Sequence, residues 1–305
     1  MHATQGPTAN YNESVSSHAG RRNLPIQSSN LSYFSKGVAT DTISAANDRK
    51  SFDIKDCVPF VTGTNNKNGM GRAFVDALLL GGARKVYATA RPNRLSELDE
   101  LVESYPDGRV VVIALDVTDQ DMVRTLGTQC PDVDLVINNA GASFSTNGGN
   151  SLVLDPEKAR MEMEVNYFGP MRIVQAFASN LTRSERKENG SCAAALVTVA
   201  SILSFRNVWA CGYGSSKAAV HYLTDAHRRD LGRNTLVIGV YPGAIDTDMN
   251  SKYEFKKYSP SSVAHELLAA LREGKEHLFP DPYSKKWVND YLERTNKSLK
   301  QLEDV

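Results

Sequence analysis

The sequence has few cysteines and no excess of charge of either sign. Among its 305 residues only Cys57, Cys130, Cys192 and Cys211 are cysteines, widely spaced and without a C-x-x-C pair. This spacing indicates neither a disulfide framework nor a zinc site, so we expect no bound metal. Thirty-five Lys and Arg balance thirty-five Asp and Glu. Without a net field to attract a polyanion, we expect neither a nucleic-acid partner nor an anionic membrane partner.

Long apolar runs are also missing. The longest charge-free stretch of the expected core, residues 190–205, is too short for a bilayer and contains Ser, Thr and Gly. No apolar signal segment begins the sequence, which favours a soluble, cytoplasmic protein. Organelle targeting is the alternative, because acidic residues are scarce near the N-terminus and Arg21 and Arg22 are present, although no amphipathic basic helix can be drawn there.

The composition changes near residue 50. Ser, Thr, Asn and Gly dominate residues 1–50, and no helical or alternating apolar period is sustained there. Such a segment cannot offset its ordering entropy, so we predict a disordered tail. Residues 51–305 are then expected to form one domain.

Within that domain, short β-branched runs alternate with segments of helical period, which is typical of parallel βαβ units. Near-continuous apolar runs favour strands that are buried on both faces. We therefore predict an α/β, doubly wound Rossmann fold with one mostly parallel seven-stranded sheet of order 3-2-1-4-5-6-7, flanked by helices. The expected strands are Val58–Thr62, Lys85–Thr89, Val110–Leu115, Leu135–Asn138, Ala193–Val199, Leu236–Tyr241 and His277–Phe279. The expected helices are Gly69–Leu80, Arg94–Ser104, Gln120–Gln129, Ala159–Leu181, Gly212–Leu231, Ser261–Glu273 and a polar surface helix over Ser284–Leu302.

A glycine-rich turn joins the first strand to the first helix. Gly63 follows Thr62, and Gly69, Met70 and Gly71 open the helix. Glycines there let backbone N–H groups approach a pyrophosphate, whose charge the helix N-terminus favours. Ligands in such sheets bind beyond the carboxyl ends of the strands. The turn therefore predicts a dinucleotide site.

Polar motifs follow the later strands in a characteristic order. Asp116 and Val117 follow the third strand, Asn138-Asn139-Ala140-Gly141 the fourth, Tyr213-x-x-x-Lys217 the fifth and Pro242-Gly243-x-x-x-Thr247 the sixth. With these motifs, residues 56–282 resemble the short-chain dehydrogenase/reductase superfamily. The resemblance implies cofactor contacts from Gly63, Gly69, Met70, Gly71, Asp116, Val117, Asn139, Ala140, Gly141, Tyr213, Lys217, Pro242, Gly243 and Thr247.

One feature departs from the family pattern. Five residues, Thr64 to Asn68, separate the first two glycines, where the family usually has three. Divergent enoyl-reductase branches also carry long turns, but they separate Tyr and Lys by six residues and here three intervene. The sequence therefore resembles the carbonyl reductases, with a lengthened phosphate loop.

The residues after the second strand predict the cofactor. A carboxylate there would bind the free ribose hydroxyl of NAD, but Ala90 occupies that position. Arg91 follows and can bind a 2′-phosphate bidentately. Lys67 resembles the second basic residue that NADP-preferring members place in the glycine loop. We therefore expect NADP(H).

Tyr213 and Lys217 are one helical turn apart and share a face. A tyrosine acts as a base near neutral pH only if its pKa falls by roughly three units, and an ammonium about 4 Å away would supply about that much. In the reduction direction Tyr213 donates its proton to the carbonyl oxygen. By resemblance, Lys217 also holds the nicotinamide ribose.

Two further residues complete the expected catalytic set. Ser201 precedes Tyr213 by twelve residues and resembles the carbonyl-orienting serine of the family, with Ser204 as its rival. Asn166 matches the helix asparagine that supports a water next to the lysine; the alternative for Asn166 is a polar residue bonded locally.

The expected substrate is a small, apolar carbonyl compound or alcohol, because the residues predicted to line its pocket are apolar: Phe144, Leu203, Phe205, Trp209, Ile245 and Met249. Two other functions stay open: an NADP-binding regulator without turnover, and a redox-neutral epimerase or dehydratase. The long apolar-faced helices around residues 159–181 and 212–231, which pair across a two-fold axis in the family, indicate a homodimer or homotetramer.

Overall fold

The computed structural model describes residues 50–144, 150–182, 189–206, 210–252 and 254–303. The predicted tail, residues 1–50, lies almost entirely outside the described residues. Within the described residues, no helix is both long enough and apolar enough to cross a bilayer.

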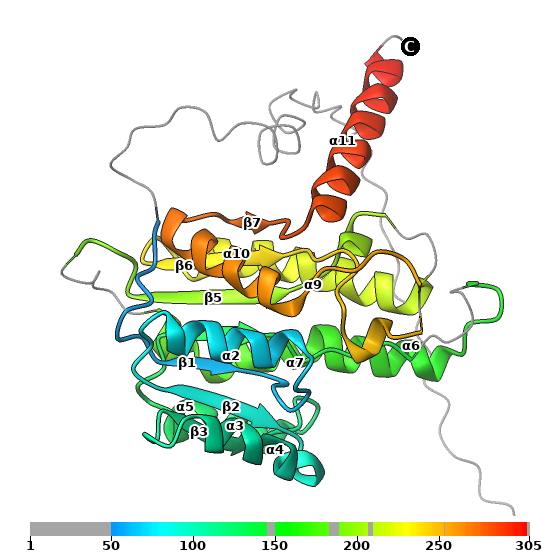
Figure 1. The fold of residues 1–305 in the computed structure, drawn as a ribbon. Helices are drawn as coiled ribbons and strands as arrows, with labels where there is room; N and C mark the ends of the chain where they lie inside the picture. The colour runs from blue at the N-terminus through cyan, green and yellow to red at the C-terminus, as the bar shows by residue number, and fades with distance from the viewer. Residues whose placement is uncertain (1–49, 145–149, 183–188, 207–209, 253, 304–305) are drawn as a thin grey trace, which may run out of the picture. The chain divides into compact units, whose positions relative to one another are not determined.

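One sheet of seven parallel strands organises the described chain, in the order β3-β2-β1-β4-β5-β6-β7 (Figure 1). This confirms the predicted topology. Most strands are buried throughout, as their unbroken apolar sequences require, because helices cover both faces. The strands are β1 (Pro59–Val61), β2 (Val86–Ala90), β3 (Val110–Ala114), β4 (Leu135–Asn138), β5 (Ala194–Val199), β6 (Thr235–Val240) and β7 (His277–Leu278).

Helices form a layer on each face of the sheet. One face is covered by α2 (Met70–Leu80), η2 (Pro92–Leu98), α3 (Asp99–Ser104) and α10 (Pro260–Glu273). The opposite face is covered by α4 (Gln120–Arg124), α5 (Leu126–Gln129), α7 (Gly169–Ala176) and α8 (Ala178–Leu181), with α9 (Cys211–Asp230) packed beside them on β6 and on α6 (Pro156–Met163).

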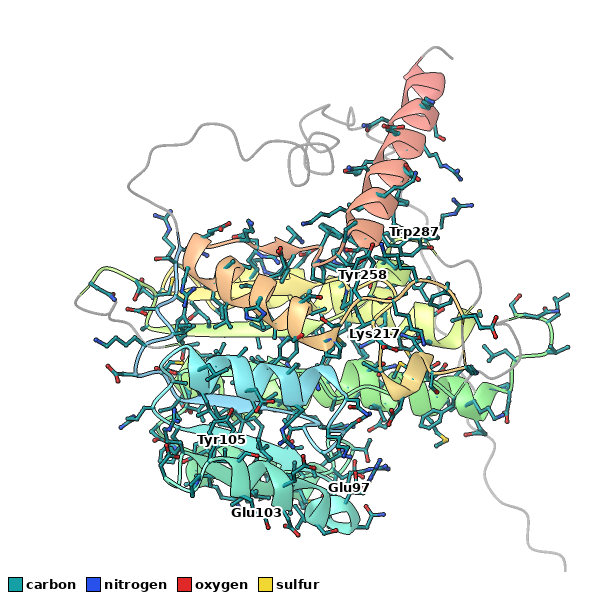
Figure 2. All side chains as sticks on the ribbon, in the orientation of Figure 1. Glu97, Glu103, Tyr105, Lys217, Tyr258 and Trp287 are labelled. Carbon is teal, nitrogen blue, oxygen red and sulfur yellow. The ribbon has the colours of Figure 1, made fainter. Side chains whose placement is uncertain are left out.

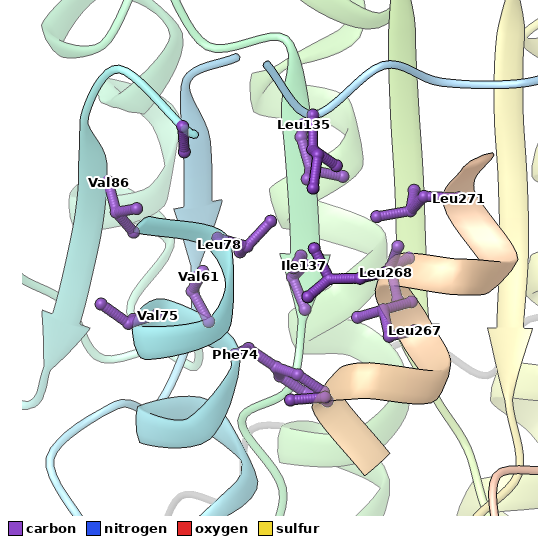
Figure 3. Close-up of a cluster of buried hydrophobic side chains, with 14 of the residues drawn as sticks. Val61, Phe74, Val75, Leu78, Val86, Leu135, Ile137, Leu267, Leu268 and Leu271 are labelled. Atoms are coloured by element: carbon purple, nitrogen blue, oxygen red, sulfur yellow. The ribbon is translucent and has the colours of Figure 1, made fainter. Parts of the chain in front are cut away.

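The core beneath α2 and α10 is the larger of the two. Phe74 and Leu78 of α2 meet Leu267 and Leu271 of α10 above Ile137 of the sheet, and each of these side chains is at most 1% exposed (Figure 3). Burying a side chain of this size stabilises the fold by about 1.5–3 kcal/mol. This packing fixes the start of α2, and with it the glycine turn.

The helix predicted over residues 159–181 is divided in the structure. Between α6 and α7, residues Glu164–Phe168 form a π-turn, η3, in which the Gly169 N–H bonds to the Glu164 carbonyl five residues earlier. Pro170 has no N–H, so the ordinary bond to the Asn166 carbonyl cannot form. Such π-turns are frequent at functional sites, and this one carries Asn166.

The last helix, α11 (Pro282–Glu303), is not purely a surface helix. Its first turns are packed against the domain: Ser284 and Val288 are buried, and Trp287 packs on Ile202 and Leu203 of η4 (Ile202–Ser204) (Figures 1 and 2). The sequence does carry a signal for this packing. It is a short apolar stripe at helical spacing in an otherwise polar segment, formed by Trp287, Val288 and Tyr291.

Candidate active site

The glycine turn and the loop after β4 form one hydrogen-bonded unit. The Thr62 hydroxyl accepts the N–H groups of Asn139 and Ala140, both at 2.9 Å. In return, Asn139 Nδ2 donates to the carbonyls of Thr62 at 2.8 Å and Gly63 at 3.0 Å. The Asn139 side chain therefore holds the two loops together at the base of the site, and its Nδ2 is hydrogen-bonded within the protein.

Two glycines of the turn are required by geometry. Gly63 has φ +70°, a left-handed conformation that favours glycine. A Cβ on Gly71 would overlap the Gly63 carbonyl oxygen and lie 2.6 Å from Asn139 Nδ2. The first turn of α2 can thus approach the loop only because residue 71 has no side chain.

The lengthened loop between these glycines is held by side chains. Asn65 Nδ2 donates to the Glu97 carboxylate of η2, and Asn66 Nδ2 donates to Asp248, which begins η5 (Asp248–Asn250), each at 2.9 Å. Asn66 Oδ1 also accepts the Asn68 N–H at 3.0 Å. The extra residues therefore bridge the ends of β2 and β6.

A groove of about 600 Å³ runs along the carboxyl ends of the strands, and we call it the nucleotide groove. Its shape and its glycine-lined wall at the start of α2 fit an extended dinucleotide. Asp116 is half-buried in its wall and accepts from the Thr118 N–H and hydroxyl at 2.9 and 2.7 Å. The predicted residues that line it are Gly63, Gly69, Met70, Gly71, Arg91, Asp116, Val117, Asn139, Ala140, Gly141 and Thr247.

Three basic side chains lie near this end of the sheet, with different surroundings. Arg91 is exposed on the nucleotide groove. Arg94, which sequence reasoning missed, lines the same groove and pairs with Glu97 through contacts of 2.5 and 2.7 Å (Glu97 is labelled in Figure 2). Lys67 instead lines a separate groove between α2 and α10, with its Nζ 3.9 Å from the Glu100 carboxylate.

A smaller cavity of about 90 Å³, the inner cavity, adjoins the nucleotide groove. Ser201, two residues beyond β5, faces it together with Tyr213 and Lys217 from the first turns of α9. Pro242 and Gly243, directly beyond β6, complete its wall. The structure thus brings together groups that are far apart in the sequence.

Lys217 is buried, with 4% of its surface exposed, and its Nζ donates to the Val199 carbonyl at 2.8 Å (Figure 2). Burial lowers the pKa of Lys217 to about 8. The Nζ lies 5.7 Å from the centroid of the Tyr213 ring.

The pKa of Tyr213 is raised to about 12, not lowered as predicted. Burial is the largest cause, and the Glu162 carboxylate adds to the increase, while a hydrogen bond with Ser201 opposes it. The difference from the sequence prediction arises because burial disfavours the charged phenolate. Near neutral pH Tyr213 is therefore a protonated phenol.

The two candidate serines have different partners. The Ser201 hydroxyl accepts the Leu203 N–H at 3.2 Å and bonds with Tyr213. Ser204 Oγ donates to the Lys217 carbonyl at 2.8 Å and so holds η4 on α9. Ser201 alone of the two lines the inner cavity.

Asn166 links three elements. Its Nδ2 donates to the Ala142 carbonyl and to Ser216 Oγ, and its Oδ1 accepts the Ala142 N–H, all at 2.8–2.9 Å. The bonds to Ala142 and Ser216 join the π-turn to the loop after β4 and to α9. A purely local role is therefore excluded.

The loop after β6 is anchored from the C-terminal helix. Asp281 is 1% exposed; its Oδ2 accepts the Gly243 N–H at 2.9 Å and its Oδ1 accepts the Ser284 N–H at 2.8 Å. One carboxylate therefore holds both the Pro242–Gly243 turn and the first turn of α11. The sequence marks Asp281 as a helix N-cap, because Pro282 follows it, but nothing local indicates its bond to Gly243.

Of the apolar residues expected around a substrate, Ile245 and Met249 line the inner cavity and Phe144 lines the nucleotide groove. Phe205 instead packs among Tyr241, His221 and Phe279. Leu203 is in the buried cluster beneath Trp287. Trp209 lies outside the described residues.

Glu162 is a residue that sequence reasoning missed. It lies on α6, where Glu157, Lys158 and Arg160 are exposed, yet its own exposed fraction is 0%. Its Oε1 accepts the Phe144 N–H at 2.7 Å. The mixed charges of α6 gave no signal for a buried carboxylate. In the part of the chain that the structure describes, no three His, Cys, Asp or Glu side chains are grouped as metal ligands.

The chain is similar to known oxidoreductases. The sequence profile of the short chain dehydrogenase family matches residues 58–257. A 3alpha-hydroxysteroid dehydrogenase of Mediterraneibacter gnavus is 29% identical over 73% of this chain and 84% of its own length. Dehydrogenase/reductase SDR family member 7B of Bos taurus is 28% identical over 75% of each chain. A short chain dehydrogenase of Burkholderia cenocepacia, solved in complex with NADP, is 32% identical, with a TM-score of 0.70 over 81% of this chain and 97% of its own.

Proposed function

The chain belongs to the short-chain dehydrogenase family, and from this premise we propose that it is an NADP(H)-dependent oxidoreductase that interconverts a carbonyl compound and an alcohol. Oxidoreduction follows from the family. The choice of cofactor, the class of substrate and the role of Tyr213 are the parts that we propose.

The adjacency of the two cavities carries this proposal. The inner cavity and the nucleotide groove share Met70, Asn139, Gly141, Thr247 and Met249 in their walls. A nicotinamide ring reaching from the groove into the inner cavity would meet the side of the site that holds Ser201 and Tyr213. Proximity of this kind is the requirement for hydride transfer coupled to proton transfer.

Bound NADPH would supply the hydride, and the remaining chemistry belongs to the protein. Tyr213, a phenol of raised pKa, donates its proton to the carbonyl oxygen as an alkoxide develops there. Ser201, already bonded to Tyr213, orients the same oxygen. Lys217, mostly an ammonium below its pKa of about 8, offsets the negative charge left on the phenolate.

Asn166 and Gly141 support the return of a proton to Lys217. The point that a Cβ of residue 141 would occupy lies 3.2 Å from Asn166 Oδ1 and 3.5 Å from Lys217 Nζ. Glycine leaves this space open, so one water would reach both groups. Asn166 would thus hold the first water of a path from Lys217 to solvent.

Three observations favour NADP(H) over NAD(H). Ala90 ends β2 where a carboxylate would repel a 2′-phosphate. Arg91 and Arg94 both line the groove beyond it. The Burkholderia cenocepacia dehydrogenase, with a similar fold at 32% identity, was solved with NADP. One negative charge acts against the binding of a 2′-phosphate here: the carboxylate of Glu97, which pairs with Arg94.

The substrate side of the inner cavity is apolar. Ile245 is buried and Met249 is 46% exposed, and both face this cavity. Together with Phe144 on the adjoining wall, these side chains favour a hydrophobic aldehyde, ketone or alcohol.

The proposal is tested by following the absorbance of NADPH and NADH with a panel of apolar aldehydes, ketones and quinones. We expect NADPH consumption matched by alcohol formation. Interconversion of epimers or loss of water without net NADPH consumption would indicate a redox-neutral enzyme. Tight NADPH binding without turnover of any compound would indicate a regulator.

We also propose that the protein is a homodimer or homotetramer. Large apolar side chains are exposed on the helices that would pair: Met161 on α6 is 50% exposed and Tyr222 on α9 is 69% exposed. Light scattering at micromolar concentration tests this, and a mass of one chain would contradict it.

A further inference from the structure

The carboxylate of Glu162 is buried between α9, which carries Tyr213, and the loop that carries Phe144, outside both cavities. Glu162 has no exposed surface and does not line the nucleotide groove or the inner cavity. A buried charge is costly unless it is well hydrogen-bonded. The Glu162 carboxylate therefore depends on the groups that surround it.

On one side, Glu162 holds the loop that follows Gly141. Its Oε1 accepts the N–H of Phe144, whose ring faces the nucleotide groove, at 2.7 Å. Asn166, four residues later in the sequence, holds Ala142 of the same loop. The loop is thus fastened at two points to one helical segment.

On the other side, Glu162 abuts the start of α9. A Cβ on Gly212 would overlap Glu162 Oε2, so the carboxylate occupies this position because residue 212 has no side chain. Ala210, the N-cap of α9, supplies no side-chain cap. A carboxylate near the first turn of a 20-residue helix is stabilised by its unpaired N–H groups and its dipole. Tyr213 follows Gly212 directly.

We propose that Glu162 is a positioning residue for the reaction: its carboxylate joins the loop that carries Phe144 to the first turn of α9, and so fixes Tyr213 relative to Phe144. This inference rests on the proposed function, because it assumes that Tyr213 transfers the proton. The carboxylate also sets the electrostatic environment of the phenol, whose pKa it raises.

Few other charges act on Tyr213. The charged side chain is Lys217 of α9, and the Ser201 hydroxyl after β5 is a neutral hydrogen-bond partner. The segment 142–144 carries no ionisable side chain, and the neighbouring charges of α6, Glu157, Lys158 and Arg160, are exposed. A change at Glu162 therefore has a distinct electrostatic signature.

Two variants separate the effect of the Glu162 charge from the effect of its hydrogen bond to Phe144. Glu162→Gln keeps an acceptor for the Phe144 N–H and removes the charge, so the pKa of Tyr213 should fall by about half a unit or more. The tyrosine-dependent limb of the pH–rate profile then moves to lower pH in both reaction directions, with the Kd for NADPH within about twofold of wild type. Glu162→Ala also removes the acceptor, and amide exchange at Phe144 should accelerate about tenfold or more. Glu157→Gln, exposed on the same helix, is the control and should change neither readout.

If the Glu162 variants do not fold, Gly212→Ala displaces the carboxylate from the other side and should shift the same pH limb. Amide exchange at Phe144 needs no substrate, so it still tests the attachment if no turnover is found. A Glu162→Gln or Gly212→Ala profile that superimposes on wild type, or unchanged Phe144 exchange in Glu162→Ala, overturns the proposal.

Discussion

Cofactor choice depends on single residues at the end of β2, above all on Arg91. A guanidinium–phosphate pair is worth about 1.5–3 kcal/mol, so Arg91→Ala should weaken NADPH binding by roughly tenfold to a hundredfold. NADH has no 2′-phosphate and should be nearly indifferent. Fluorescence titration of both cofactors measures this, with Arg84→Ala, exposed beside Asp132, as the control.

The double variant Ala90→Asp with Arg91→Ala should go further. Its new carboxylate would repel the phosphate and bind the free ribose hydroxyl, which should invert the preference toward NADH. Equal loss of both cofactors in Arg91→Ala would contradict an NADP-specific role and shift attention to Arg94.

A second residue-scale prediction concerns pH. His277 contacts Tyr241, and burial lowers the pKa of His277 to about 4, with the Arg228 charge contributing. The unfolded chain, with a pKa near 6.5, binds a proton between pH 6.5 and 4 that the folded chain does not. The free energy of unfolding should therefore fall as pH falls through this window, by roughly 2–3 kcal/mol.

Urea unfolding of wild type and His277→Gln at pH 7 and pH 4 measures this contribution. The stability of wild type relative to the variant should decrease toward pH 4, whereas His265→Gln, exposed on α10, should track wild type throughout. A constant difference between wild type and His277→Gln would refute the titration of His277.

At the scale of elements, Asp281 couples α11 to the loop after β6. Asp281→Ala leaves the buried N–H groups of Gly243 and Ser284 without their acceptor, at a cost of about 1–3 kcal/mol each. We expect lower thermal stability and a weaker affinity for NADPH, because the Pro242–Gly243 turn loses its anchor. Asp290→Asn, which alters only an exposed pair with Lys286, is the matched control. Unchanged NADPH affinity in a destabilised Asp281→Ala would show that α11 supports the fold alone.

Elements also show what the sequence could predict. All seven strands were found from local apolar runs, and Gly63, Tyr213 and Ser201 from motifs that follow them. The π-turn was not predicted from the sequence, because its signal is a single proline in a helical pattern. The role of Glu162 and the bond between Asp281 and Gly243 were not predicted, because these contacts join residues 18 and 38 positions apart, which no local pattern encodes.

At the scale of the whole molecule, the start of the domain is sharply defined. Phe52 and Ile54 are 0% and 2% exposed, and the Phe52 N–H bonds to the Leu271 carbonyl at 2.8 Å. Removal of residues 1–49 should leave the Tm and NADPH affinity nearly unchanged, because their composition lacks a core-forming period. Phe52→Ala should cost about 3–5 kcal/mol. Calorimetry compares the two, and a fall of several degrees in the truncated chain would show that the tail packs on the domain.

The central claim is that Tyr213 transfers the proton in an NADPH-dependent carbonyl reduction, and Tyr213→Phe tests it most directly. This change keeps the ring and removes only the hydroxyl. With a carbonyl substrate identified in the panel, NADPH consumption and alcohol formation are measured for wild type and variant, together with the Kd for NADPH. Turnover should fall by about 10² to 10⁴, while NADPH binds within about twofold of wild type. Near-normal turnover by Tyr213→Phe would contradict the claim and place the acid elsewhere.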